Sequence, residues 1–131
     1  MPIEIREVTS KRELDQFIKL PFELYKNNPY WVPPIIMEEK MTFTKGKNPA
    51  LDFCDVKLFL ALKNNKPVGR IASIINHKAN EVWKSKHARF GWIDFIDDYE
   101  VSSALFKAAE SFAQEKGMDA IHGPLGFTDF D

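Results

Sequence analysis

The sequence has little cysteine, no long apolar run and no excess of charge of either sign. Cys54 is the single cysteine, so the chain forms no internal disulfide, and we expect a reducing, cytoplasmic location. The longest apolar runs, such as residues 58–62, are far shorter than the roughly 20 residues that cross a bilayer. Residues 1–7 carry acids and show no secretory signal. We therefore expect no membrane partner.

The charge balance also argues against a nucleic-acid partner. Lys and Arg together number 18 against 19 Asp and Glu, whereas a dedicated nucleic-acid binder shows a large basic excess. The three histidines, His77, His87 and His122, are scattered, and no Cys-x-x-Cys or His-x-x-x-His spacing occurs. We expect no metal site.

What the sequence does have is the material for one folded domain. A chain of 131 residues, 44% hydrophobic and 13% aromatic, can build a sizeable core. It contains no repeat, no low-complexity tract and no linker that divides it. We expect a single domain over residues 1–131.

The first part of the chain predicts one strand and two helices. Residues 2–8 alternate and indicate a strand, and Ser10 with Glu13 forms a capping box that starts a helix. Pro21 predicts a kink in that helix or a restart, because proline has no N–H to donate. Residues 30–34 are proline-rich and extended, residues 34–41 favour a short helix, and residues 42–52 favour a loop.

The second part predicts a hairpin followed by a β-α-β unit. Strands are expected at 55–62, 68–76, 89–96 and 118–122, with a short helix at 77–84 and a long one at 97–116 ended by Gly117. The order β-α-α-β-β-β-α-β indicates an α/β (α+β) fold with a mixed sheet, whose last two strands are parallel through a right-handed crossover.

This order and several local motifs resemble one superfamily. Residues 59–72, a hydrophobic strand, a polar turn and a returning Val-Gly-Arg strand, are similar to the middle of the GNAT superfamily of acyl-CoA-dependent N-acyltransferases. The chain also resembles the N-terminal half of an uncharacterised bacterial GNAT-like family. The motifs that carry this closer resemblance are at residues 28–34, 68–72, 90–95 and 122–127.

The resemblance implies an acyl-CoA donor, and the sequence departs from the family where that donor binds. GNAT enzymes hold pantetheine beside the fourth strand and pyrophosphate on a glycine-rich loop at the start of the next helix. That loop here contains three acids and no glycine, which predicts a self-capped helix that repels phosphate. The implied positions for acetyl-CoA or another acyl-CoA are Ile93, Phe95, Ile96, Asp97, Asp98 and Ser102.

The chain also stops before the last two strands of the full GNAT fold. An uncovered terminal strand can pair with another chain. We therefore expect a homodimer or a missing C-terminal half.

Five side chains are candidates for the chemistry. Strand alternation places Asp94 on one face with Phe90, Trp92 and Ile96. Desolvation there would raise the pKa of Asp94, which would suit a general base. The alternative is a carboxylate that is exposed to solvent or bonded to a neighbouring backbone group. The candidate substrate-binding residues have structural alternatives too, namely core packing, an ion pair with Asp55, or a surface position. They are Tyr30, Trp31, Arg70 and His122.

Two functions follow from this resemblance. The first is an acyl-CoA-dependent N-acyltransferase, such as an N-acetyltransferase, with a degenerate pyrophosphate loop, Asp94 as base and a small-molecule amine as acceptor. The second is a catalytically inactive GNAT-like module for binding or dimerisation, since a fold does not fix a function.

Overall fold

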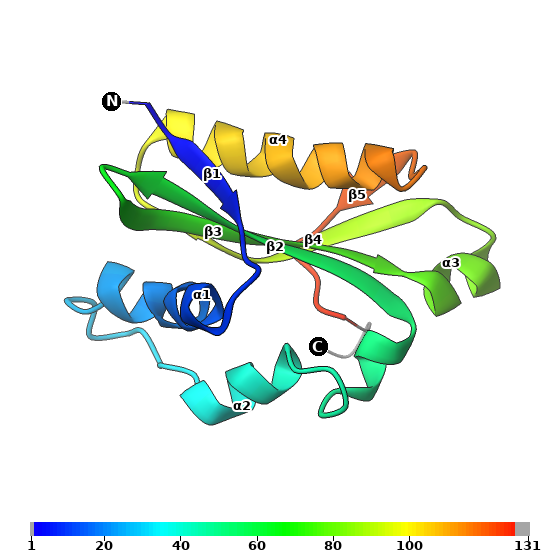
Figure 1. Ribbon diagram of the computed structural model, residues 1–131, viewed down its shortest axis with the longest axis horizontal. Coiled ribbons are helices and arrows are strands. Elements are labelled where there is room, and N and C mark those ends of the chain that lie inside the picture. The colour runs from blue at the N-terminus through cyan, green and yellow to red at the C-terminus, as the bar shows by residue number, and fades with distance from the viewer. Residues whose placement is uncertain (1, 128–131) are drawn as a thin grey trace.

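The computed structural model describes residues 2–127 as a five-stranded sheet with helices on both faces (Figure 1). The order of elements agrees with the prediction, apart from one short 3-10 helix inside the expected loop. The elements are β1 Glu4–Glu7, α1 Lys11–Leu24, α2 Ile36–Thr42, η1 Pro49–Asp52, β2 Cys54–Lys63, β3 Lys66–Asn76, α3 His77–Trp83, β4 His87–Phe95, α4 Tyr99–Glu115 and β5 Ala120–His122.

The sheet follows the order of the sequence, β1-β2-β3-β4-β5. The first three pairings are antiparallel, and β4 pairs with β5 in parallel. The expected hairpin and the expected parallel pair are therefore both confirmed. The parallel pair is joined by α4, which supplies the crossover helix that a parallel connection requires.

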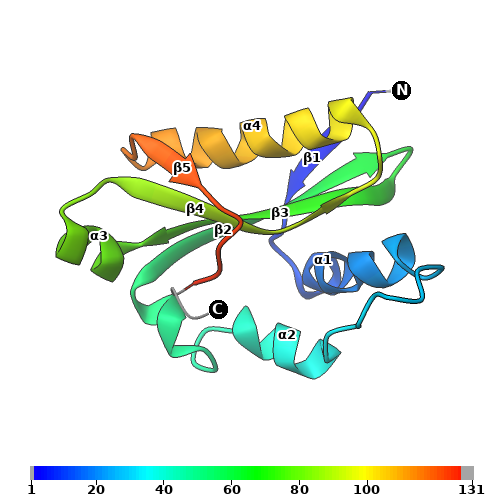
Figure 2. The same ribbon diagram turned by 180° about the vertical axis from the view of Figure 1, so that it is seen from behind.

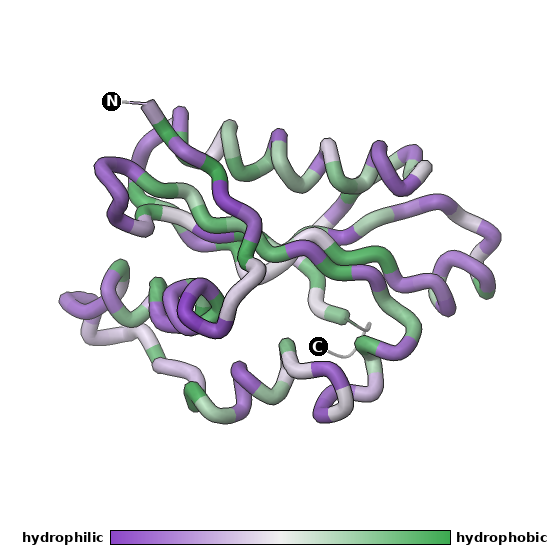
Figure 3. Tube along the Cα trace, in the orientation of Figure 1, coloured by the Kyte–Doolittle hydropathy of each residue, from purple (hydrophilic) through white to green (hydrophobic). Residues whose placement is uncertain are grey.

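Helices cover the sheet on both sides. In Figures 1 and 2, α4 lies along one face, while α1 and α2 lie on the other. Each face has its own core: Leu105 and Ile71 lie in the first, and Phe17 and Leu60 in the second. Figure 3 shows the central strands as mostly hydrophobic and the helices as mixed, which is the pattern of a sheet buried on both faces.

Helix α1 begins as the sequence predicts and passes through its proline. The Ser10 side chain accepts from the backbone N–H of Glu13, and the Glu13 carboxylate accepts from the backbone N–H of Ser10 at 3.1 Å. The capping box is confirmed. The helix does not restart at Pro21; it continues to Leu24 with Pro21 buried inside it.

A β-bulge in β4 corrects the expected alternation of that strand. Gly91 pairs with Ala72 and Asp94 with Arg70, so two residues of β4 lie opposite one residue of β3, and Trp92 has φ 45°. The extra residue shifts the later side chains to the opposite face. Phe90, which lies before the bulge, therefore packs in the α4 core, on the opposite face from Asp94. Ile96 packs in the same core because β4 ends at Phe95 and strand alternation no longer applies to it. The expectation that Phe90 and Ile96 share a face with Asp94 is wrong.

Strands β4 and β5 separate soon after they pair. Among the described residues, β5 pairs with β4 only opposite His87–Arg89. The chain then crosses to the α1–α2 face, where the Leu125 N–H donates to the Phe90 carbonyl at 2.8 Å and Phe127 is buried. Along the described chain, the edge of β4 over residues 91–95 that faces β5 has no strand partner.

Candidate active site

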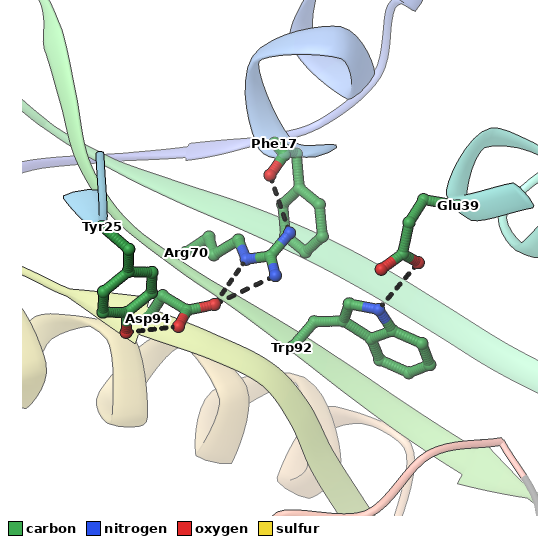
Figure 4. A network of polar contacts seen from close by, with 6 residues as sticks. All are labelled: Phe17, Tyr25, Glu39, Arg70, Trp92 and Asp94. Atoms are coloured by element: carbon green, nitrogen blue, oxygen red, sulfur yellow. Dashed lines mark hydrogen bonds and ion pairs between the residues drawn. The ribbon is translucent and has the colours of Figure 1, made fainter. Parts of the chain in front are cut away.

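The carboxylate of Asp94 is held by two side chains from other elements (Figure 4). Oδ1 accepts from the Tyr25 hydroxyl at 2.7 Å, and Oδ2 accepts from Nε of Arg70 at 3.0 Å and lies 3.0 Å from Nη2. The Asp94 side chain is 17% exposed. It is thus neither a lone carboxylate among aromatic rings nor a freely solvated one.

Arg70 reaches Asp94 from the neighbouring strand β3 and is almost fully buried. Its third contact is a hydrogen bond from Nη1 to the backbone carbonyl of Phe17 in α1, at 2.9 Å, and its guanidinium carbon lies 5.0 Å from the centre of the Phe17 ring. Burial lowers the pKa of Arg70, and attraction to Asp94 opposes this. The fork geometry of arginine suits such a bridge between a carboxylate and a carbonyl.

Tyr25 is the residue that follows the last turn of α1. The pKa of Tyr25 is raised to about 12, chiefly by the hydrogen bond to Asp94 and to a lesser extent by burial. The ring of Trp31 lies 5.6 Å from that of Tyr25 and 5.1 Å from that of Phe22. Trp31 therefore packs over the end of α1, beside the Asp94 network.

Trp92 lies between two hollows on the same face as Asp94. One, of about 470 Å³, is lined by Met41, Thr42 and Ala50 among others; the second, of about 250 Å³, lies between Gly91 and residues 124–126. The indole Nε1 donates to the Glu39 carboxylate at 3.2 Å. Asp94 lines neither hollow and is separated from them by one residue along β4.

The start of α4 is occupied by its own acid. Asp98 is the N-cap: Oδ1 accepts from the Glu100 N–H at 2.9 Å, and its backbone carbonyl accepts from Val101 and Ser102. The pKa of Asp98 is lowered, chiefly by the hydrogen bond from the Glu100 N–H and next by the hydrogen bond from Lys63. Self-capping of this helix is confirmed.

The other expected cofactor positions are divided between core and surface. Ile93 and Ile96 pack against the α4 core, and the Ile96 N–H donates to the Val68 carbonyl at 2.9 Å. Phe95 and Asp97 are exposed, and the Ser102 hydroxyl donates to the Tyr99 carbonyl at 3.1 Å. The backbone donors at residues 96, 98 and 100–102 are all used within the chain.

The expected substrate residues do not form one group. Trp31 and Arg70 lie at the Asp94 network, whereas Tyr30 is 90% exposed. His122 lies at the far end of β4, with its ring 5.5 Å from that of His87, beside a hollow near α3. The expected alternative pairing of Arg70 with Asp55 is wrong, because Asp55 bonds to His77.

Sequence reasoning missed Tyr25 and Glu39 as members of the site. Tyr25 is far from Asp94 in the sequence, and no local sequence pattern predicts their contact. The sequence did carry a signal for another contact of the site, the one between Arg70 and Phe17. Pro21 leaves the carbonyl of Phe17, four residues earlier, without its helical donor, so that a buried side chain must supply one.

Residues 2–127 contain neither a metal-binding cluster nor a membrane-spanning helix. No group of three or more His, Cys, Asp or Glu is arranged to hold a metal ion. No helix of that part of the chain has the length and apolar content to cross a membrane.

Two curated bacterial proteins are similar to this chain in sequence. Protein YghO of Escherichia coli K12 is 36% identical over 92% of the chain, and the bacterial ceramide synthase of Caulobacter vibrioides is 32% identical over 96%. The chain spans only about a third of either relative, 31% and 33%. No protein-family profile matches the sequence.

Solved structures with the same architecture are acetyltransferases. Aminoglycoside acetyltransferase AAC(6')-Iy, bound to a CoA-containing bisubstrate analogue, has a TM-score of 0.67 at 15% identity over 95% of this chain and 81% of its own. A tandem GNAT protein of clavulanic acid biosynthesis has a TM-score of 0.67 at 14% identity over 89% of this chain and 34% of its own. The chain therefore has the GNAT acetyltransferase fold.

Proposed function

We propose that this chain is the N-acyltransferase domain of a longer protein and that it transfers an acyl group to an amine. The observation that carries the proposal is the open edge of β4 at its bulge, with the Asp94 carboxylate on the same short stretch of strand. An extended ligand can pair with the backbone of such an edge. The fold neighbours crystallised with CoA derivatives support this direction.

The acyl donor fits this chain only in part. The unpaired β4 edge suits the extended pantetheine arm, whose amides can pair with backbone groups. The diphosphate does not fit the start of α4, because Asp98 takes the Glu100 N–H and adds negative charge there. We therefore expect the domain to hold the donor by its thioester arm, and we assign no residue of α4 to phosphate.

We assign the proton transfer to Asp94. A neutral amine attacks the thioester carbonyl and forms the C–N bond, the C–S bond breaks, and one proton leaves the nitrogen. Asp94 accepts that proton, and the departing thiolate is protonated to the free thiol. The carboxylate has about four acceptor positions. It accepts hydrogen bonds from the Tyr25 hydroxyl and from Nε of Arg70, and Nη2 of Arg70 also lies 3.0 Å from Oδ2, which leaves capacity for an ammonium group. Arg70 and Tyr25 keep the carboxylate in one orientation, which a general base requires.

The acceptor that suits this surface best is an amphiphilic amine. Five large apolar side chains are exposed between α1 and the end of α2, namely Tyr30, Val32, Ile35, Met37 and Met41. A polar sugar amine would gain no binding energy from contact with them. Met41 also lines the larger hollow beside Trp92. Exposed apolar patches of this kind mark binding surfaces. The name of the ceramide synthase relative agrees with a lipid acceptor.

The test is an acyl-transfer assay on the longer protein that contains this chain. Acyl-CoA is offered with a long-chain amine or with an aminoglycoside, and the amide product is measured. We expect turnover with the long-chain amine, at least about tenfold less turnover with the aminoglycoside, and loss of turnover in Asp94→Asn. Asp119→Asn, at an exposed acid beyond the far end of α4, is the matched control and should keep full activity.

Binding of both ligands without any amide product would contradict the proposal. It would favour a GNAT scaffold that binds without catalysis. Equal activity in Asp94→Asn and the parent protein would remove Asp94 from the mechanism while leaving acyl transfer in place.

A further inference from the structure

We propose that Pro21 is a positioning residue for the active site, because it reserves the carbonyl of Phe17 for Arg70. This inference rests on the proposed function, in which Asp94 receives the proton. Pro21 itself contacts neither the carboxylate nor a substrate in this scheme. It acts through the hydrogen bond that it cannot make.

Helix α1 lacks one of its regular backbone hydrogen bonds at Pro21. In an α-helix the carbonyl of residue 17 accepts from the N–H of residue 21. Pro21 has no N–H, yet α1 continues through it to Leu24, and its carbonyl accepts from Tyr25 as in any helix. The Phe17 carbonyl is therefore left without a helical partner inside a core where Phe17 is fully buried.

Arg70 supplies the missing donor. Nη1 bonds to the Phe17 carbonyl at 2.9 Å, while Nε and Nη2 hold one oxygen of Asp94 at 3.0 Å each. The planar guanidinium is thus fixed at both ends, and its plane decides where the Asp94 carboxylate lies (Figure 4). A buried proline, which has a high intrinsic cost in a helix interior, thereby acquires a role in the site.

The same helix holds the second donor to Asp94. Tyr25 follows directly after α1, so a helix that straightens or shifts at Pro21 moves the hydroxyl that bonds Oδ1. Both contacts of the carboxylate therefore depend on the last turns of α1.

Pro21→Ala restores the N–H and tests the inference. The alanine N–H competes with Arg70 for the Phe17 carbonyl, and the guanidinium becomes freer to rotate. We expect stability that is unchanged or higher, kcat lowered about tenfold or more, and KM for the amine within about twofold. A purely structural role would move stability and kcat in the same direction.

A second measurement is independent of activity. The Nε–H of Arg70, followed by NMR, should exchange with solvent at least about tenfold faster in Pro21→Ala than in the parent chain. Lys19→Ala, at an exposed position on the same helix, is the matched control and should leave that exchange unchanged. This readout tests the positioning role even if the protein proves to have no transferase activity.

A double-variant cycle completes the test. Arg70→Lys keeps the charge but cannot bridge the carbonyl and the carboxylate, so Pro21→Ala should add no further loss of kcat in that background. Additive losses, or an unchanged Arg70 exchange rate in Pro21→Ala, would overturn the inference. Should Pro21→Ala not fold, Pro21→Ser supplies the same N–H, and failure of both to fold would also count against it.

Discussion

Nζ of Lys63 lies 3.3 Å from Oδ2 of Asp98, so the residue that caps α4 is also tied to the hairpin between β2 and β3. The same Asp98 accepts the Glu100 N–H with its other oxygen. One carboxylate thus occupies the place where a bound phosphate would need both a backbone donor and a nearby cation. The N–H groups of residues 100–102 at the start of α4 are satisfied from within the chain.

Removing the acids at this helix start should increase affinity for CoA. The triple variant combines Asp97→Ser, Asp98→Ser and Glu100→Ser. Serine at position 98 keeps an oxygen that can cap the helix, while the negative charges that repel phosphate are removed. Each like charge at about 4 Å costs roughly 1 to 4 kcal/mol, so we expect affinity to rise about tenfold or more. Isothermal titration with CoA measures it.

The control for that variant removes the same number of charges elsewhere. Glu110, Glu115 and Asp119 lie toward the other end of α4 and beyond it, and their replacement by serine changes the net charge equally. If both triple variants gained the same affinity, the effect would be one of net charge, and the specific blockade by Asp98 would be wrong.

Asp94→Asn should destabilise the fold as well as the proposed chemistry. The substitution leaves the guanidinium of Arg70, a residue only 5% exposed, without its counter-charge. Breaking a buried ion pair from one side costs about 3 kcal/mol. Urea unfolding should report this loss, and Asp97→Asn, at an exposed position, should change stability by less than about 0.5 kcal/mol. Equal stability of the two variants would show that the Arg70–Asp94 pair contributes little.

Stability should fall with rising pH above about 10, and Tyr25 should be one cause. Its pKa is raised to about 12 in the folded chain, against about 10 when unfolded, so its contribution is complete below about pH 10 and disappears by about pH 12. We expect this part to be no more than about 2 kcal/mol, measured by urea unfolding at several pH values. Tyr25→Phe should flatten that decline, whereas Tyr99→Phe, at an exposed position, should not.

Gly91 is predicted to be intolerant of a side chain. A Cβ at this position would overlap the carbonyl oxygen of Leu125, where the chain passes β4 after β5. Gly91→Ala must therefore displace residues 123–127, at a cost of about 1–3 kcal/mol in urea unfolding. Ala120→Gly, on exposed β5, serves as the control for a local backbone change. If Gly91→Ala left the free energy of unfolding unchanged, the packing of residues 123–127 against β4 would contribute little to stability.

The sequence was sufficient for the order of elements because the signals were local. Ser10 and Glu13 form the capping box that starts α1, and Asp98 caps α4. Asn64 and Asn65 take positive φ in the expected hairpin turn. Each of these depends on hydrogen bonds within a few residues of the chain. The parallel pairing of the last two strands is not local, because His87 pairs with Ala120, but the crossover helix α4 between the two strands dictates it.

The active-site network could not be predicted because its partners are distant in sequence. Tyr25 and Asp94 are 69 residues apart, and Arg70 and Phe17 are 53 apart. The bulge at Trp92 was also missed, and it reversed the face assigned to Phe90. Strand alternation assumes a regular ladder, and one inserted residue is enough to defeat it.

The central claim is that the open edge of β4 binds the thioester arm of an acyl donor. The most direct measurement is NMR titration of the longer protein with an acyl-pantetheine, which carries the arm but no nucleotide diphosphate. We expect the largest shifts at the backbone amides of residues 91–95, with small changes at the start of α4. Shifts confined to residues 97–102, or none at any residue of β4, would contradict it.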